Sequence, residues 1–330
     1  MSSHFSQICL EHSQKTLKWV KGLISVEGKL SNYPDDLVCY YKLPYFLAIN
    51  GETILANQVL DYITKTFFKE GNLITFTTKK TGNPLMAKFW GYVIGWIAIA
   101  SQKLGRFDIS YPAFNYLSEF QSQDHGGFAT SEPWGQNDSA MDIITSAQLG
   151  RFALFFGQQK SAMKAGEFLG WMINNQPKSI EKMYLFLNNN AKYVTDFPQD
   201  LTFIYELKKN EPNQAYFMIG LPCAFLVELY QATHNINFLH FAKQYAKYAL
   251  NCHESIKSFH FSHKVAWAMS LLYKQTKEDK YLNLGKAITE YLISIQDNDG
   301  IWLKDQNEID SLDQSIENAI WLNEVAKNLS

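Results

Sequence analysis

The chain has 330 residues, of which 46% are hydrophobic and 15% aromatic, so it can bury a large apolar core. A formal net charge of −2, without a basic stripe interleaved with aromatic residues, argues against a nucleic-acid partner. The polar N-terminus has no signal-peptide core, and no run approaches the about 18 uninterrupted apolar residues of a membrane span, so we expect a cytoplasmic protein.

The first predicted element is an amphipathic helix over residues 5–24. Its apolar side chains Leu10, Leu17 and Val20 recur at helical spacing, and lysines lie between them. Five pairs of helical segments follow in chain order, each pair interrupted by a short break, and a last helix covers residues 313–327. The pairs are 37–68, broken at Asn50-Gly51; 89–121, broken at Gly105; 143–176, broken at Gly157; 216–251, broken at His234-Asn235; and 263–296, broken at Lys277.

These helices are expected to close a ring. In every pair the first helix is the more uniformly apolar, as expected for an inner position, and the second carries a stripe, as expected for an outer one. The N-terminal helix is striped and suits the outer role, so the last helix becomes its inner partner. Six hairpins then form an all-α (α/α)6 toroid, a single domain spanning residues 1–330. An open helical solenoid is the structural alternative.

The connections of this ring are unequal in length. Links within a hairpin have a few residues, whereas the links between hairpins are long and all fall on one face, at the N-terminal ends of the inner helices. The long links are 26–36, 69–82, 123–137, 177–212, 252–262 and 297–312. Long loops on a rigid scaffold commonly carry function. The inner helix N-termini also point backbone N–H groups toward this face, which favours anions or carboxylates there.

Two of these links share a motif. Gln296-x-x-x-Gly300-x-Trp302 reproduces Q-x-x-x-G-x-W, and Gln121 with Gly126-x-Phe128 is a copy with one residue inserted. The motif resembles the repeats of squalene–hopene cyclases, which belong with protein prenyltransferases to the terpenoid-cyclase type of α/α toroid. The resemblance implies a structural clamp, in which the glutamine caps a neighbouring helix and the tryptophan stacks.

The catalytic motifs of that family are missing. The sequence has no D-x-D-D motif for substrate protonation, and it lacks the Asp-x-Cys pair that holds zinc in protein prenyltransferases. The cluster of Cys252, His253, His260 and His263 matches no familiar zinc spacing, so we expect no metal. No Walker loop, G-x-G-x-x-G, H-E-x-x-H or G-x-S-x-G motif occurs, and we expect no cofactor.

Four residues near the mouth of the ring are candidate catalysts. Asp36 and Tyr40 are four apart at the start of the first inner helix, which would place an acid–base group beside a phenol. Asp142 lies four residues after Asp138, and repulsion between two carboxylates would raise the pKa of one of them. His263 begins another inner helix and suits an acid–base role. The alternatives are that Asp36 and Asp138 only cap helices and that the histidine is structural.

Aromatic residues near the same face could line a pocket. The candidates for substrate binding are Trp90, Trp134, Tyr216 and Trp267, and the alternative is that they belong to the core. An aromatic wall suits sugar stacking and carbocation stabilisation equally.

Three functions remain open on the sequence alone. The first is an intracellular enzyme that uses acid–base chemistry (cyclisation, isomerisation or elimination) on a small, partly apolar metabolite in an aromatic-lined central cavity. The second is a carbohydrate-active six-hairpin enzyme, namely a glycoside hydrolase, lyase or sugar epimerase. The third is a non-catalytic toroid that binds a ligand or a protein. The first two predict a small-molecule substrate, and the sequence leaves the oligomeric state open.

Overall fold

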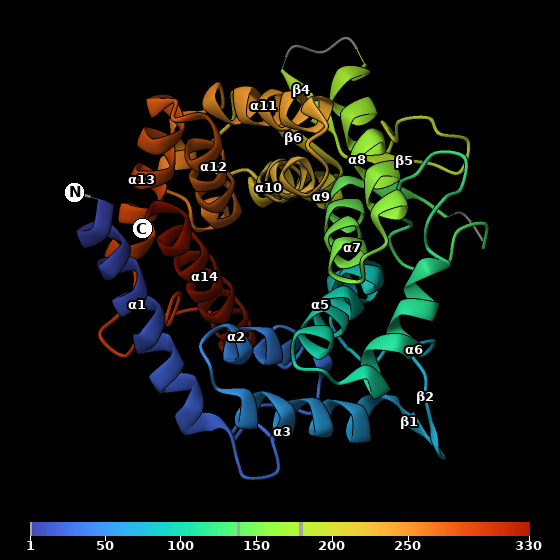
Figure 1. The fold of residues 1–330 in the computed structure, drawn as a ribbon, viewed down its shortest axis with the longest axis vertical. Helices are drawn as coiled ribbons and strands as arrows, with labels where there is room; N and C mark the ends of the chain where they lie inside the picture. Colours follow the sequence, from blue (N-terminus) through green and yellow to red (C-terminus); the bar gives the residue numbers. More distant parts are fainter. Residues whose placement is uncertain (1, 137–138, 178–180) are drawn as a thin grey trace.

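Helices dominate the computed structural model, which describes residues 2–136, 139–177 and 181–330. Figure 1 shows two concentric circles of helices around a common axis. The inner circle of the described chain consists of α2 (Leu43–Ile49), α5 (Trp90–Lys103), α7 (Ile143–Phe155), α10 (Phe217–Thr233), α12 (His263–Thr276) and α14 (Glu308–Leu329). The outer circle consists of α1 (Ser2–Leu23), α3 (Thr53–Ile63), α6 (Phe107–Ser118), α8 (Gln159–Asn174), α11 (Ile236–Leu250) and α13 (Asp279–Ser294). The predicted (α/α)6 toroid is confirmed.

The composition of each helix explains its circle. Inner helix α5 is buried without interruption from Trp90 to Ser101, because it packs against α2, α4, α6 and α7. Outer helix α3 buries one stripe, Ala56, Val59, Leu60 and Ile63, whose spacing of three and four residues places them on one face.

The two ends of the chain close the ring as predicted. The N-terminal helix α1 packs against the C-terminal helix α14, and Figure 1 shows this pair completing the circle. In the middle of the contact, Ser13 Oγ donates a hydrogen bond to the backbone oxygen of Ala319 at 2.9 Å. An open solenoid would leave these two helices apart, so the alternative architecture is excluded.

The repeated glycine turn locks neighbouring hairpins together. Gly126 and Gly300 have φ values of +79° and +90°, a left-handed conformation that favours glycine. A Cβ on Gly126 would lie 2.5 Å from the backbone oxygen of Lys164 in α8, and one on Gly300 would lie 2.5 Å from the backbone carbon of Lys15 in α1. Each turn therefore rests directly on the backbone of the next outer helix.

The glutamine of each turn holds it in place. Gln296 Nε2 donates to the backbone oxygens of His12 in α1 and of Gly300, at 3.0 and 3.1 Å. Gln121 Nε2 donates to the backbone oxygens of Gly126 and of Ser161 in α8, both at 2.9 Å. The motif is therefore a packing device between consecutive hairpins.

The same turn occurs a third time without its glutamine. Gly28 has a φ of +83°, and a Cβ on it would lie 2.5 Å from the backbone carbon of Gln58 in α3. Two residues after each glycine, a backbone N–H donates to a hydroxyl of the next inner segment: Phe128 to Ser146, Trp302 to Ser315, and Leu30 to Tyr40. Of the three equivalent clamps found among the described residues, the sequence motif therefore detects two.

The connections between hairpins hold short elements. They are η1 (Leu37–Cys39), the π-helical turn η2 (Thr64–Phe68), β1 (Lys69–Glu70), β2 (Leu73–Ile74), α4 (Pro84–Lys88), β3 (Met141–Asp142), β4 (Lys182–Tyr184), β5 (Phe186–Leu187), η3 (Gln199–Leu201), α9 (Thr202–Tyr205), β6 (Glu206–Lys208), η4 (Glu254–Lys257) and η5 (His260–Ser262). The strands pair antiparallel as β1–β2, β3–β5 and β4–β6.

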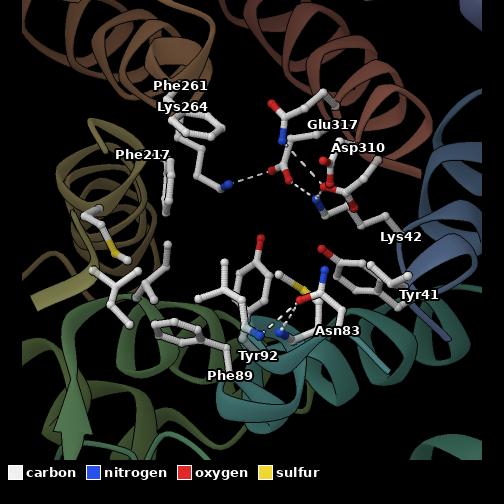
Figure 2. Close-up of a pocket in the computed structure, with 18 of the residues that line it drawn as sticks. Tyr41, Lys42, Asn83, Phe89, Tyr92, Phe217, Phe261, Lys264, Asp310 and Glu317 are labelled. Atoms are coloured by element: carbon white, nitrogen blue, oxygen red, sulfur yellow. Dashed lines mark hydrogen bonds and ion pairs between the residues drawn. The ribbon is translucent and has the colours of Figure 1, made fainter. Parts of the chain in front are cut away.

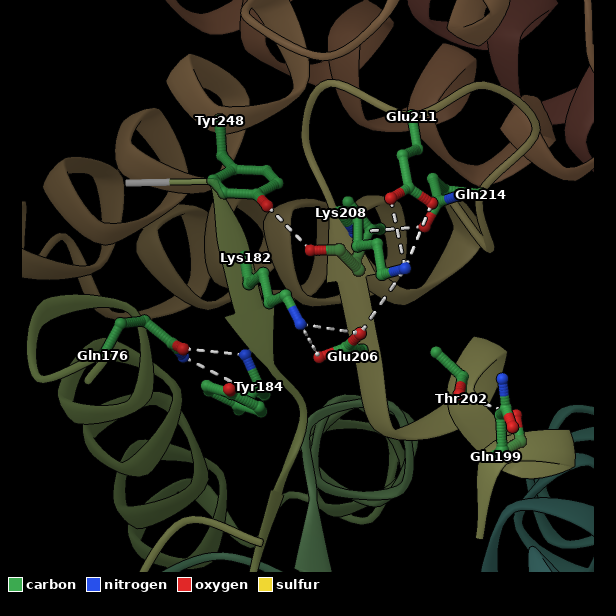
Figure 3. A network of polar contacts seen from close by, with 11 residues as sticks. Gln176, Lys182, Tyr184, Gln199, Thr202, Glu206, Lys208, Glu211, Gln214 and Tyr248 are labelled. Carbon is green, nitrogen blue, oxygen red and sulfur yellow. Dashed lines mark hydrogen bonds and ion pairs between the residues drawn. The ribbon is translucent and has the colours of Figure 1, made fainter. Parts of the chain in front are cut away.

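The connection between α8 and α10 is braced by ion pairs. The carboxylate of Glu206 is nearly buried and lies 3.2 Å from Lys182 Nζ and 3.9 Å from Lys208 Nζ (Figure 3). Tyr248 of α11 donates to the backbone oxygen of Leu207 at 3.0 Å and ties β6 to the outer circle. These contacts hold β6 in place, and with it α9, which directly precedes β6 in the chain.

Candidate functional site

A cavity of about 170 Å³ opens on the face where the inner helices begin. Its charged and polar wall comes from the segment before α2, from the start of α12 and from the first turns of α14. Its apolar wall comes from α4, α5, α9 and α10. The side chains that matter for its chemistry are Tyr41, Lys42, Phe89, Tyr92, Phe203, Phe217, Phe261, His263, Lys264, Asp313 and Glu317. Figure 2 labels eight of them: Tyr41, Lys42, Phe89, Tyr92, Phe217, Phe261, Lys264 and Glu317.

A buried carboxylate, Glu317, is the centre of the polar wall. It forms ion pairs with Lys42 and with Lys264, whose Nζ lies 2.6 Å from Glu317 Oε1, and all three side chains are nearly inaccessible to solvent. Trp321, one turn further along α14, donates its Nε1–H to Glu317 at 2.7 Å. Lys42 also reaches Asp313 at 2.8 Å. Two ammonium groups therefore face two carboxylates at the wall of the cavity.

The two lysines are not equivalent. Burial alone lowers the pKa of both amines. For Lys42, the carboxylates of Asp313 and Glu317 outweigh burial and raise its pKa above the usual value. For Lys264, burial prevails over the attraction of Glu317, Lys42 adds repulsion, and the pKa falls to about 8. Burial tends to raise the pKa of Glu317, but Lys264 and Lys42 hold it well below its usual range.

The hydrogen bonds of His263 define its tautomer. Its Nδ1 lies 2.7 Å from the backbone oxygen of His260, and a carbonyl oxygen can only accept, so Nδ1 carries the hydrogen. The other nitrogen, Nε2, lies 3.2 Å from Lys264 Nζ and 3.6 Å from Glu317 Oε1. Burial, together with the charge of Lys264, lowers the pKa of His263 and outweighs the opposing effect of Glu317, so Nε2 keeps its lone pair. The imidazole is therefore a neutral base beside an amine.

The opposite wall is aromatic. Phe217 lies with its ring centroid 5.2 Å from Lys264 Nζ, and Tyr92 presents its phenol toward the centre of the cavity (Figure 2). Burial raises the pKa of Tyr92 well above its usual value, so its hydroxyl stays a hydrogen-bond donor. Phe203 of α9, in the connection 177–212, also belongs to this wall. Lys88 of α4 donates a hydrogen bond to the hydroxyl of Tyr205, which is also in α9, at 2.9 Å.

Of the four predicted catalytic residues, His263 lines this cavity. Asp36 instead caps η1 by accepting from the backbone N–H of Val38 at 2.9 Å, and it also accepts from Gly82 at 2.6 Å. Tyr40 accepts from Leu30 in the clamp described above. The prediction placed both residues on the first inner helix, but that helix begins later, at Leu43. The adjacent Tyr41 and Lys42 reach the cavity.

Asp142 precedes its inner helix. It lies in β3 and is the N-cap of α7, accepting from the backbone N–H groups of Ile144 and Thr145 at 2.8 Å and from Thr130 Oγ1 at 2.9 Å. Burial raises its pKa, and these hydrogen bonds oppose the rise. Asp138, its predicted partner, lies outside the described residues. The structure therefore does not bring Asp36, Tyr40 and Asp142 to the cavity with His263.

The four aromatic candidates also lie outside the cavity lining. Trp90 is fully buried and donates its Nε1–H to the backbone oxygen of Phe76 at 2.9 Å. Trp267 stacks on Trp321 with ring centroids 4.3 Å apart, Tyr216 hydrogen-bonds to Ser255, and Trp134 is half-buried beside His125. The aromatic wall comes from other residues, Phe89, Tyr92, Phe203, Phe217 and Phe261.

Sequence reasoning missed the charged residues on inner helices. Lys264 directly follows His263, and Glu317 and Trp321 are one turn apart on a helix assigned to packing. The available signal was a charged residue within an inner helix, such as Glu317 or Lys264, because a buried charge almost always has a charged partner nearby. Within the described residues no group of three or more histidine, cysteine or acidic side chains is suited to a metal, and no helix there is both long and apolar enough to cross a bilayer.

Comparison with known proteins gives similarity in structure alone. No family model and no curated protein sequence matches the chain. A solved structure of D-mannose isomerase has a TM-score of 0.74 at 14% identity, with 97% of each chain covered. A cellobiose 2-epimerase from Bacillus thermoamylovorans has a TM-score of 0.67 at 12% identity, covering 99% of this chain and 100% of its own. A GH76 α-mannanase from Bacteroides thetaiotaomicron has a TM-score of 0.66 at 13% identity, covering 97% of this chain and 95% of its own.

These similarities place the fold among the six-hairpin rings of sugar isomerases, epimerases and mannanases. The assignment to the terpenoid-cyclase and prenyltransferase type is therefore wrong, and a cyclase reaction has no support. The reason is physical. The Q-x-x-x-G-x-W turn holds one hairpin on the next, and any ring of helical hairpins can use that contact whatever its chemistry.

Proposed function

We propose that this chain is a carbohydrate-active enzyme that interconverts small sugars by moving a proton next to a carbonyl group, as an isomerase or epimerase does. The observation that carries the proposal is the neutral, nearly buried His263 whose Nε2 lies 3.2 Å from Lys264, in a cavity with an aromatic wall. The names of two similar structures, D-mannose isomerase and cellobiose 2-epimerase, support the same class of reaction. The cavity, at about 170 Å³, is below the range of about 300–1,000 Å³ typical of drug-sized ligands, which favours a single sugar unit.

The chemistry requires a base and a group that stabilises negative charge. In the open-chain form of the sugar, His263 Nε2 takes the proton from the carbon next to the carbonyl. Ammonium and phenol donors, Lys264 and Tyr92, stabilise the enediolate oxygen that develops. Return of the proton to the neighbouring carbon, with transfer of the hydroxyl proton from one oxygen to the other, gives the isomer. Return to the original carbon after the planar intermediate has turned its other face to His263 gives the epimer.

Glycoside hydrolysis is the second carbohydrate reaction to consider, because mannanases share the fold. A retaining or inverting hydrolase needs one carboxylic acid that stays protonated. Glu317 is held ionised by two lysines, and Asp313 is paired with Lys42. One similar mannanase is described as inactive after two neighbouring aspartates were replaced. The sequence has one such pair, Asp35-Asp36, and Asp36 caps η1, so proton transfer at a carbonyl is the better supported reaction.

Hydrogen–deuterium exchange tests the proposal. The protein is incubated in D₂O with D-mannose, D-fructose, D-glucose or cellobiose, and NMR follows deuterium entering the carbons next to the carbonyl together with product formation. In the His263→Gln variant, the rate of deuterium exchange should be about 10²–10⁴-fold lower than in the wild type. His253→Gln is the matched control, because His253 caps η4 and is not part of the cavity lining.

Two outcomes would overturn the proposal. Exchange that persists unchanged in His263→Gln would remove the assigned base. Saturable binding of a sugar without any exchange would favour the non-catalytic, ligand-binding toroid.

A further inference from the structure

We propose that Lys264 is a nucleophile that forms an imine with the carbonyl group of an open-chain sugar or another small aldehyde or ketone bound in the cavity. This inference deepens the proposed function and rests on it for the class of substrate. It assigns covalent chemistry to a residue that the proton-transfer scheme uses only as a donor.

The geometry is that of an activated nucleophile. Such sites place a base within hydrogen-bond reach of the nucleophile, and a third group orients the base. Here the amine of Lys264 lies 3.2 Å from His263 Nε2, and His263 is oriented through its Nδ1–H by the backbone oxygen of His260. Figure 2 shows the Lys264 side chain extending from α12 across the cavity toward Glu317, with Phe217 beside it.

The surrounding charges allow Lys264 to lose its proton. The groups that face it are Glu317, His263 and, through the shared carboxylate, Lys42 and Asp313. Lys42 keeps its proton and remains the permanent counterion of Glu317, so the carboxylate is not left unpaired when Lys264 is neutral. The pKa of about 8 for Lys264, against an ordinary value of about 10.4, increases the neutral fraction near pH 7.5 about two-hundredfold.

The covalent step balances without an oxidant or a reductant. The lone pair of Lys264 Nζ attacks the carbonyl carbon, the first N–H proton passes through His263 to the carbonyl oxygen, and a carbinolamine forms. His263 accepts a proton from the nitrogen and returns it to the departing hydroxyl, so water leaves and a C=N bond remains. Protonation of that nitrogen withdraws electrons from the neighbouring carbon and makes its hydrogen more acidic, which assists the proposed isomerisation.

Reductive trapping of the wild-type protein tests the inference. The protein is treated at pH 8 with glycolaldehyde or D-mannose and sodium cyanoborohydride, which reduces an imine to a stable amine, and peptide mass mapping locates the adducts. We expect Lys264 to be modified at least about tenfold faster than Lys304, an exposed lysine that serves as the internal reference. In His263→Gln, labelling of Lys264 should slow while labelling of Lys304 stays the same.

The outcomes separate this inference from the proposed function. Labelling of Lys304 without faster labelling of Lys264 overturns the imine, whether or not sugars exchange deuterium. Preferential labelling of Lys264 without deuterium exchange supports the imine and refutes the proposed isomerase activity. Labelling that is equally fast in His263→Gln removes the assigned base and overturns the inference as stated.

Discussion

The substitution Trp302→Ala tests whether the turn after α13 is a structural clamp. Trp302 is 0% exposed, and its Nε1 donates to the backbone oxygen of Leu292 at 2.8 Å. A buried tryptophan removes about 150–250 Å² of surface from water. At about 25 cal/mol per Å² this area corresponds to about 4–6 kcal/mol, and measured truncations of buried aromatic residues cost about 3–5 kcal/mol. We therefore expect the free energy of unfolding to fall by about 4 kcal/mol.

Urea unfolding followed by far-UV circular dichroism measures this loss without using the fluorescence of the removed tryptophan. With an m-value of about 3 kcal/mol/M, the midpoint should fall by about 1.3 M. The matched control is Trp302→Phe, which keeps most of the buried area and removes the hydrogen bond to Leu292, at a cost of about 1 kcal/mol. Because Trp302 is not part of the cavity lining, sugar handling by the folded fraction should be unchanged. An unchanged midpoint together with lost sugar exchange would refute the clamp and move this turn into the active site.

Three further predictions follow from described contacts. Gly300→Ala should lower the melting temperature by far more than Gly105→Ala, since both glycines have positive φ but only at Gly300 does a Cβ meet backbone, 2.5 Å away; equal losses would contradict the close approach. Glu317→Gln should destabilise the fold by about 3–5 kcal/mol at pH 7. Because the pKa of Glu317 is lower in the folded protein, its carboxylate stabilises the fold above its unfolded pKa of about 4.3, and this stabilisation is lost as the pH falls below that value. Urea unfolding between pH 7 and pH 3 should therefore show a fall in the free energy of unfolding of the wild-type protein that the variant lacks. Asp142→Asn should lower the free energy of unfolding by about 1 kcal/mol through a weaker helix cap and leave deuterium exchange unchanged. Loss of exchange at unchanged stability would support the catalytic role predicted from the sequence.

The ring was predictable because its signal is distributed over the whole chain. Every hairpin repeats the same contrast between an apolar first helix and a striped second helix, so an error of a few residues in any boundary does not change the fold. The clamp at Gly28 was not predictable, because its segment keeps the glycine and lacks the glutamine and the aromatic residue that mark the other two.

The site depended on boundaries that periodicity cannot define. The helix after Asp36 begins at Leu43 instead of directly after the aspartate, and this shift sends Asp36 and Tyr40 into local hydrogen bonds while Lys42 reaches Glu317. His263 was predicted correctly to lie at the cavity because it is the first residue of its helix, and the start of that helix was predicted correctly. Glu317 required knowledge of which helices meet across the ring, since its partners are far away in sequence on α12 and before α2.

The closed ring limits how such a protein can change during evolution. An open solenoid lengthens by duplicating a repeat, because a new unit needs only one neighbour on each side. In this ring α1 is fastened to α14, and a seventh hairpin would alter the angle at every interface between hairpins. Diversity must therefore enter through the connections on the cavity face, as the α8–α10 connection illustrates by supplying Phe203 to the wall without disturbing the circle of helices behind it.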